Sequence, residues 1–355
     1  MERAGAPRGA SLWQRASAAL GLSPGLRVLA ICMSAEPLLP ELARRGVELL
    51  ACDWHHAALQ RAVRSGLPAS ATLPWTGPDR PSLPGAPFDA ALCDLAQLEG
   101  RAAFADAVRC AVAALKPGGR LLVCGGRAEG VGGAALRLGA WLGSAQVLAY
   151  GGRRRILSAR RAPEAAVPPP ERAAPQEVAL GGVQLRLLPA DAVFARGLPD
   201  AAAALLAATM AARGVAAMAV CDVGCGGGAL GLCALRLGAG RCTAVDENLR
   251  ALAAVRANAA HNGLAERVLA VAADAVQEVP GGPYPLVLCN PPFHAGPAED
   301  RALGRAVVAS AWAATARGGR LFVVASGFLR YEREVPALRE VAAAAGFRVL
   351  CAVRP

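Results

Sequence analysis

The sequence predicts an α/β protein with two tandem domains, each an open parallel sheet covered by helices. The 355 residues contain two series in which short apolar runs, typical of buried strands, alternate with helical segments. This alternation is characteristic of βα units. A proline-rich segment at 162–177 separates the two series and predicts a semi-rigid linker. The predicted division is therefore a first domain at 1–161, the linker at 162–177 and a second domain at 178–355.

The first domain is expected to contain the strands 27–31, 47–52, 88–93 and 120–124. Helices are expected at 36–45 and 102–115, each lying between two of these strands. The second helix is followed by Lys116-Pro117-Gly118-Gly119. Proline and glycine end a helix there, because proline lacks a backbone donor and glycine favours other backbone angles.

The second domain opens with a predicted hairpin, in which Gly181-Gly182 joins the strands 178–180 and 183–187. Asp200 is a suitable N-cap for the helix that follows. Further strands are predicted at 216–223, 241–245, 267–272, 285–289, 320–325 and 347–353, and helices at 201–213, 229–237, 249–262, 300–316 and 335–345. The two halves thus have the pattern of a duplicated α/β domain.

Most of the net positive charge lies in the first half of the chain. Residues 1–162 carry 20 Lys and Arg against 11 Asp and Glu, whereas residues 163–355 carry 18 against 16. A basic half suggests an acidic partner such as nucleic acid, and Arg153-Arg154-Arg155 beside the linker is a candidate phosphate contact. A solvated, arginine-rich surface is the alternative interpretation of both observations.

The cysteines and histidines predict neither disulfides nor a metal site. No Cys-x-x-Cys pair occurs among the eleven cysteines, and the four histidines lack metal-ligand spacing. The N-terminus lacks the apolar region and cleavage site of a signal peptide, and the apolar stretch 201–220 is interrupted by Arg213 and Gly214. We therefore expect a reduced, cytoplasmic protein without a membrane span.

A glycine-rich turn, Asp222-Val223-Gly224-Cys225-Gly226-Gly227-Gly228, joins a predicted strand to a helix. Glycine there lets the backbone approach a ligand closely, and the helix N-terminus offers free N–H groups. Asp246 ends the next strand, where a carboxylate can accept both ribose hydroxyls, and Asp274 ends the third, within reach of an adenine amine. The turn with Asp246 would also fit a dinucleotide site.

The most informative stretch is Asn290-Pro291-Pro292-Phe293, which follows the apolar strand 285–289. Two prolines stiffen this loop, so that it presents an amide side chain, backbone carbonyls and an aromatic ring. These groups can hold a planar exocyclic amine, although a strand-ending turn with a buried Phe is the alternative. Beside a nucleoside site such a loop favours methyl transfer, because a dehydrogenase has no use for it.

On these residues the second domain resembles class I S-adenosylmethionine-dependent methyltransferases that modify exocyclic nitrogens. The longer run Asn290-Pro291-Pro292-Phe293-His294-Ala295-Gly296 is similar to the ribosomal RNA guanine-N2 methyltransferases, the RsmC and RlmG family, and the segments 188–194 and 324–332 agree. One departure is Arg330 before Tyr331, where the family more usually has proline. The resemblance implies a fold of two tandem Rossmann-like methyltransferase domains, the N-terminal one degenerate.

The implied reaction is methyl transfer from S-adenosylmethionine to the N2 amine of a guanine in ribosomal RNA. Asn290 Oδ1 and the Pro291 carbonyl would accept the amine hydrogens, and Phe293 would stack on the base. His294 is expected to contact phosphate or to be structural. The expected cofactor-binding residues are Asp222, Gly224, Cys225, Gly226, Asp246, Asp274 and Asn290. The expected partner is ribosomal RNA or a ribosomal subunit, bound by a monomer without a metal.

The first domain lacks both signatures of the second. Its first strand runs into Cys32-Met33-Ser34-Ala35-Glu36 without a glycine turn, and its counterpart of the Asn-Pro-Pro loop is Cys93-Asp94-Leu95-Ala96. We therefore expect a structural or RNA-binding role there, with no cofactor.

Two other functions stay open at this point. One is N-methylation of another planar group, such as adenine N6 or a protein glutamine, which the four-residue loop alone would permit. The other is a non-catalytic RNA-binding assembly factor that has kept the fold.

Overall fold

The computed structural model describes residues 11–21, 23–34, 36–76, 83–98, 100–170, 173–274, 282–291 and 298–355. The chain divides into two compact units, Met1–Glu171 (unit 1) and Arg172–Pro355 (unit 2). The boundary between them lies within the segment predicted as a proline-rich linker.

Unit 1 is a seven-stranded sheet in the order β3-β2-β1-β4-β5-β7-β6. Its strands are β1 (Arg27–Ile31), β2 (Glu48–Asp53), β3 (Thr72–Pro74), β4 (Phe88–Asp94), β5 (Leu115–Gly126), β6 (Gln146–Gly151) and β7 (Arg154–Arg160). Its α-helices are α1 (Leu12–Leu20), α2 (Leu38–Arg44), α3 (His56–Arg64), α4 (Gly100–Ala114) and α5 (Val131–Leu142). The first five strands run parallel, whereas β7 pairs antiparallel with both β5 and β6.

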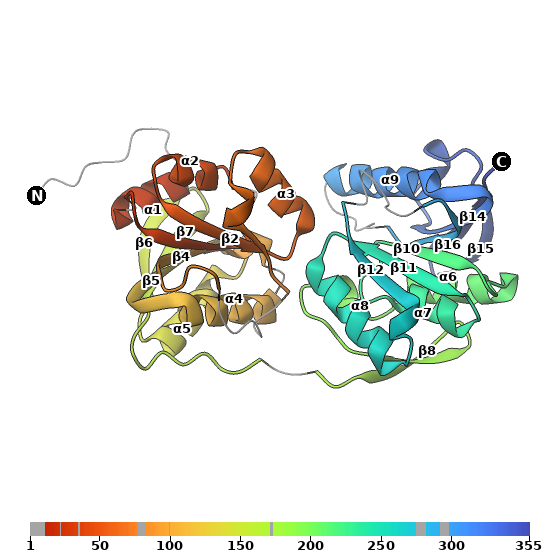
Figure 1. Cartoon of the computed structure of the whole chain (residues 1–355), viewed down its shortest axis with the longest axis horizontal. Helices are drawn as coiled ribbons and strands as arrows, with labels where there is room; N and C mark the ends of the chain where they lie inside the picture. Colours follow the sequence, from red (N-terminus) through yellow and green to blue (C-terminus); the bar gives the residue numbers. More distant parts are fainter. Residues whose placement is uncertain are drawn as a thin grey trace, which may run out of the picture. The chain divides into compact units, whose positions relative to one another are not determined.

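Unit 2 repeats this strand order as β12-β11-β10-β13-β14-β16-β15. Its sheet contains β10 (Ala219–Val223), β11 (Arg241–Asp246), β12 (Val268–Ala272), β13 (Tyr284–Cys289), β14 (Thr315–Ser326), β15 (Arg339–Ala344) and β16 (Phe347–Val353). Its α-helices are α6 (Ala201–Arg213), α7 (Ala229–Arg236), α8 (Leu249–His261) and α9 (Ala298–Ala313). Figure 1 shows α9 on one face of this sheet and α7 and α8 on the other. The same order in both units is what a duplicated domain requires.

Two sequence predictions about these sheets were wrong. The sheets are mixed rather than wholly parallel, because each ends in an antiparallel hairpin. The predicted helix at 335–345 is instead strand β15, which pairs antiparallel with β16 through a turn at Ala345 (φ 51°) and Gly346 (φ 81°). Alanine-rich segments favour helix locally, but pairing with a neighbouring strand overrides that weak preference.

The small hairpin before α6 agrees with its prediction. Strands β8 (Gln176–Leu180) and β9 (Val183–Leu187) pair antiparallel. Gly181 and Gly182 both have positive φ, at 59° and 83°, as a two-residue turn with the twist of a hairpin requires. Asp200 is also confirmed as the N-cap of α6, since its Oδ1 accepts from the Ala203 amide at 2.8 Å.

The core of unit 2 reaches the carboxyl edge of its sheet, the edge at which the parallel strands end. Aromatic residues make up only 4% of the chain, so valine, leucine and alanine fill most of this core. Val223, Val245, Cys289 and Val323, all fully buried near the ends of four strands, belong to one apolar cluster with Tyr331. This packing holds the ends of the four strands in place, and the candidate site residues follow those strand ends.

Candidate active site

The carboxyl ends of four strands bring the predicted site residues to one edge of the unit 2 sheet. Val223, at the end of β10, pairs with Val245 on one side and with Cys289 on the other. Gly224 and Asn290 therefore leave neighbouring strands at the same level. The helix that follows β10 lies on one face of the sheet, and the helix that follows β13 lies on the other (Figure 1). In open α/β sheets, ligands bind where the connections diverge in this way.

The glycine turn after β10 has the backbone shape that its sequence predicts. Gly224, Gly226 and Gly228 have φ of 69°, 51° and 81°, a left-handed region that other residues adopt only with strain. The amides of Gly224 and Cys225 donate to the Val245 carbonyl at 2.9 and 3.1 Å, and α7 begins directly after Gly228. The turn is thus anchored to β11 by hydrogen bonds within the protein.

Asp246 links the second strand end to this turn. Its Oδ2 accepts from the Gly226 amide and its Oδ1 from the Asn248 amide, both at 2.9 Å. A carboxylate oxygen can accept a second hydrogen bond, so this arrangement keeps acceptor capacity for ribose hydroxyls. Asp274 follows β12 by two residues and is half-buried.

Two predicted cofactor residues lie behind the turn. Asp222 is 1% exposed, and its Oδ2 accepts from the Gly231 amide in the first turn of α7 at 2.9 Å. Cys225 is also buried, and burial raises the pKa of its thiol well above the usual value. The structure therefore gives both side chains a buried position beneath the turn, and their role in cofactor binding stays a prediction.

Burial makes Asp222 a source of pH dependence. It raises the pKa of this carboxyl to about 7, against the lowering effect of the Gly231 bond, and the nearby Asp246 charge raises it further. Since the unfolded pKa is about 4, ionisation between pH 4 and pH 7 favours the unfolded state. Wild-type protein should lose up to about 4 kcal/mol of unfolding free energy over this range relative to Asp222→Asn. The asparagine can still accept from Gly231. Denaturant unfolding of both proteins at pH 4.5 and pH 8 checks this, and parallel pH profiles would contradict it.

A segment that overlaps the family-like stretch 188–194 covers the glycine turn. The Gly197 backbone lies so close to Gly227 that a Cβ on Gly227 would stand 2.8 Å from the Gly197 carbonyl carbon and closer still to its oxygen. Ala192, Ala195 and Arg196 all have left-handed backbone angles, with φ of 58°, 48° and 55°. Such strain is found where surrounding structure imposes it, often at functional sites. This covering segment, residues 190–197, also carries Phe194, which is 50% exposed.

Three asparagines hold the covering segment and its approach in place. Asn248 donates from Nδ2 to the Ala192 carbonyl at 2.5 Å. Asn258, fully buried on α8, accepts from the Leu188 amide at 2.7 Å and donates to the Gly227 carbonyl at 2.9 Å. Asn262, one turn later, exchanges two bonds with the Arg186 backbone. Asn258 inside the alanine-rich helix α8 was the available signal, because asparagine is a poor helix former, whereas Asn262 is the C-cap of that helix.

Asn290 presents an unsatisfied acceptor at this edge. The residue is half-buried, and its Oδ1 is buried without a hydrogen-bond partner in the part of the chain that the structure describes. A buried acceptor without a partner costs about 1–3 kcal/mol of folding free energy. A hydrogen-bond donor on a ligand would remove that cost. Pro291 is buried beside it, and the Asn290 carbonyl lies 4.0 Å from a Cβ placed on Gly224. Phe293 and His294 lie outside the described residues.

Unit 1 carries other residues at the equivalent positions. Ile31 pairs with Cys52 and Cys93 as Val223 pairs with Val245 and Cys289. By this register Cys32 corresponds to Gly224, Asp53 to Asp246 and Asp94 to Asn290.

The side chains at and beside these unit 1 strand ends contact one another. Asp94 is 1% exposed and forms an ion pair with Arg154, which also pairs with Glu129 at 3.0 Å. Trp54 and Trp75, both buried, follow the ends of β2 and β3 and stack with their ring centroids 5.3 Å apart. Of the predicted phosphate contacts, Arg154 is therefore already engaged by two carboxylates.

Within the described ranges, His, Cys, Asp and Glu side chains do not gather in threes or more in a way that could hold a metal ion. Across the same residues, each helix is too short or too polar to span a membrane.

Comparisons with known proteins agree with this geometry. Residues 184–351 match the model of the methyltransferase small domain family. The ribosomal RNA small subunit methyltransferase C of Pseudomonas paraeruginosa is 34% identical over 268 residues, which are 71% of this chain and 76% of the relative. The ribosomal RNA large subunit methyltransferase G of Ectopseudomonas mendocina is 38% identical over 145 residues, 39% of this chain and 38% of the relative.

A solved structure is similar over nearly the whole chain. It is the T. thermophilus 16S ribosomal RNA N2 guanine methyltransferase RsmC, in complex with AdoMet and guanosine. The two proteins are 27% identical with a TM-score of 0.79, and the match covers 93% of this chain and 88% of the other.

Proposed function

This chain belongs to the ribosomal RNA small subunit methyltransferase C family, and we propose that Asn290 in unit 2 is its target-amine residue. The protein is an S-adenosylmethionine-dependent methyltransferase of guanine N2 in ribosomal RNA. The observation that carries the proposal is the buried, unpartnered Asn290 Oδ1 beside the glycine turn.

The residues at the carboxyl edge fit the cofactor. The glycine turn and the start of α7 would provide a backbone surface that the cofactor can approach closely, and Asp246 would bind the ribose hydroxyls. Asp274 would reach the adenine amine. Bound S-adenosylmethionine supplies an electrophilic methyl group on a sulfonium centre.

The amine of the target guanine would be held by two acceptors, Asn290 Oδ1 and the Pro291 carbonyl. Together they accept both N2 hydrogens, which draws the nitrogen toward sp³ and fixes the direction of its lone pair. Phe293 would stack on the guanine ring. The N–C bond forms as the S–C bond breaks, and the proton left on nitrogen passes to water. Alignment supplies most of the acceleration in this scheme, and the base must first leave any stack in the RNA.

Unit 1 is proposed to bind RNA without binding the cofactor. Two observations beside the unit 1 strand ends support this: Trp54 stacks on Trp75, and Asp94, the counterpart of Asn290 by strand register, forms an ion pair with Arg154. The excess of positive charge in residues 1–162 supports an RNA-binding role.

The small ribosomal subunit is the proposed substrate, because the relatives that match most of the chain carry that name. Mass spectrometry of ribosomal RNA from a deletion strain should show loss of one N2-methylguanosine from 16S RNA. Re-expression of the wild-type protein should restore it, and the Asn290→Ala variant should not. Loss from 23S RNA instead would overturn the choice of subunit, and no loss at all would overturn the proposed activity.

A further inference from the structure

We infer that Phe328 and Arg330, on the loop that follows β14, bind the RNA strand beside the target guanine. Phe328 stacks on a neighbouring base, and Arg330 contacts a backbone phosphate of the same strand. The inference rests on the proposed function and adds two positioning residues to it. This post-β14 loop comprises residues 327–334.

The post-β14 loop begins at the edge of the sheet where Asn290 lies. Strand β14 runs parallel to β13, with Val323 opposite Cys289, so both strands end at the same edge. Tyr331 of the loop is 2% exposed and shares an apolar cluster with Cys289, the residue before Asn290. The inner side of the loop is therefore part of the support beneath the target-amine residue.

The outer side of this loop presents an aromatic ring and a cation. Leu329 and Tyr331 are buried, whereas the alternate residues Phe328 and Arg330 are exposed, Phe328 by 58%. Phe328 and Phe194 are the exposed aromatic residues among those described in unit 2. Both belong to segments at the carboxyl edge. Because Leu329 and Tyr331 pack into the core, the alternate residues Phe328 and Arg330 are held facing solvent.

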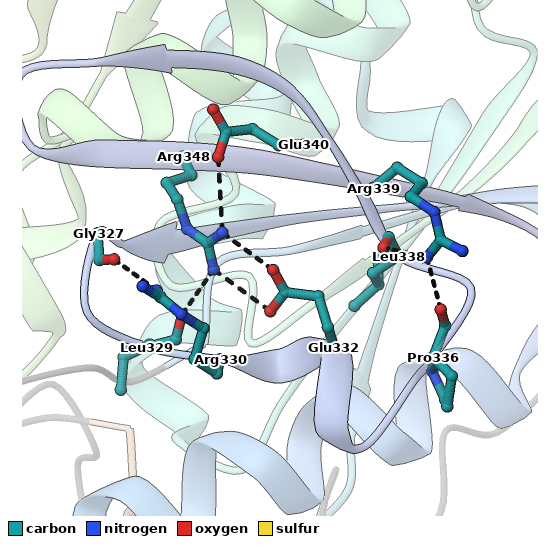
Figure 2. Close-up of polar contacts among 9 residues, drawn as sticks. All are labelled: Gly327, Leu329, Arg330, Glu332, Pro336, Leu338, Arg339, Glu340 and Arg348. Carbon is teal, nitrogen blue, oxygen red and sulfur yellow. Dashed lines mark hydrogen bonds and ion pairs between the residues drawn. The ribbon is translucent and has the colours of Figure 1, made fainter.

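The arginines around the loop differ in whether their charge is neutralised. Arg348 pairs with Glu332 at 2.9 Å and Glu340 at 3.5 Å, and also donates to the Leu329 carbonyl at 2.6 Å, as Figure 2 shows. Arg330 Nη1 donates instead to the carbonyls of Gly327 at 2.6 Å and Leu329 at 3.2 Å. Among the described side chains, no carboxylate lies within 4.0 Å of the Arg330 guanidinium. The guanidinium is thus held in place by backbone carbonyls, and the more distant Glu332 compensates its charge only in part.

This pair of groups suits single-stranded RNA. A guanine that enters the site must leave its stack, and its neighbour then loses a stacking partner. An exposed aromatic ring replaces that partner without regard to base identity, and an arginine beside it meets the phosphate. An acidic protein surface would use the charge of Arg330 but would gain little from a solvated phenyl ring, so RNA is the partner that explains both.

The test measures methylation of ribosomal RNA from a deletion strain as a function of RNA and salt concentration. Phe328→Ala should raise KM for RNA by roughly 5- to 100-fold with kcat and cofactor affinity unchanged, and Phe328→Trp should restore KM. Arg330→Gln keeps a hydrogen-bonding side chain without the charge. It should reduce the slope of log KM against log salt by about 0.7, the effect of one lost phosphate contact on a single strand.

Arg339 provides a matched control (Figure 2). Its Nη1 also donates to the carbonyls three residues and one residue earlier, Pro336 at 2.6 Å and Leu338 at 2.8 Å, and it is exposed. It pairs with Cys351, which is opposite Phe322, and so lies further from the carboxyl edge than Ser326. Arg339→Gln should therefore leave the salt slope unchanged.

The outcomes separate this inference from the proposed function. Wild-type KM and salt slope in both the Phe328→Ala and Arg330→Gln variants would overturn the inference and leave the proposed function intact. Equal losses in Arg330→Gln and Arg339→Gln would also overturn it, because they would reflect net charge alone. If the wild-type protein methylates no ribosomal RNA, the proposed function itself fails.

Discussion

Replacing Asn290 by alanine is expected to lower kcat for RNA methylation by about 10²–10³-fold while leaving cofactor affinity within about threefold. The side-chain oxygen is buried and has no hydrogen-bond partner among the described residues, so its removal breaks no hydrogen bond within that part of the chain. The loss should appear only when the guanine amine is in place. Single-turnover methylation measures the rate, and calorimetry with S-adenosylmethionine should still show one site per chain.

Unit 1 supplies the control for this prediction. Asp94 occupies the position equivalent to Asn290 by strand register, and Asp94→Asn alters that position without touching the proposed site. Its kcat should equal that of the wild-type protein. An Asn290→Ala protein that methylates RNA at the wild-type rate would show that the amine is held by other groups, and a second cofactor site would show that unit 1 is functional.

Gly227→Ala is expected to weaken cofactor affinity by roughly tenfold or more and to lower the unfolding free energy by about 1–3 kcal/mol. The new Cβ would stand within 3.0 Å of three backbone atoms of Gly197, and backbone cannot rotate away as a side chain can. The covering segment must therefore move off the glycine turn. Calorimetry with the cofactor and chemical denaturation measure the two effects.

Gly139→Ala is the matched substitution. Gly139 lies within α5, and a Cβ there would meet nothing within 4 Å. Alanine should therefore add about 0.5–1 kcal/mol of stability through its better helix propensity, with cofactor affinity unchanged. If Gly227→Ala bound the cofactor like Gly139→Ala, the contact between Gly197 and Gly227 would have no part in the site.

The sequence predicted which residues meet at the carboxyl edge of the unit 2 sheet where the signal was local, and their roles stay predictions. Glycines at a strand end, carboxylates after the next strands and an Asn-Pro pair are each visible within a few residues, and the strand pairing brings them together. Phe293 stays a prediction. The asparagines Asn248 and Asn258 were missed because their role is to bond segments far away along the chain, and neighbouring residues do not reveal such partners.

The fold was predicted less well at the outer edge of each sheet. The strands of the β6–β7 hairpin and strand β15 were not predicted, since their pairing depends on a strand already in the sheet. Local preference favours helix in the alanine-rich stretch before Gly346, and only the tertiary pairing decides otherwise. The parallel centre of each sheet, which positions the site, has a clear apolar pattern and was predicted closely.

The covering segment has a consequence for the entropy of binding. Its left-handed residues Ala192, Ala195 and Arg196, the bond from Asn248 and the contact between Gly197 and Gly227 restrict residues 190–197 in the free protein. The covering segment loses its conformational freedom when the chain folds, so little conformational entropy remains to be lost when a ligand binds. A ligand meets a surface that is already ordered, and its affinity is set by the contacts it makes rather than by the cost of arranging them.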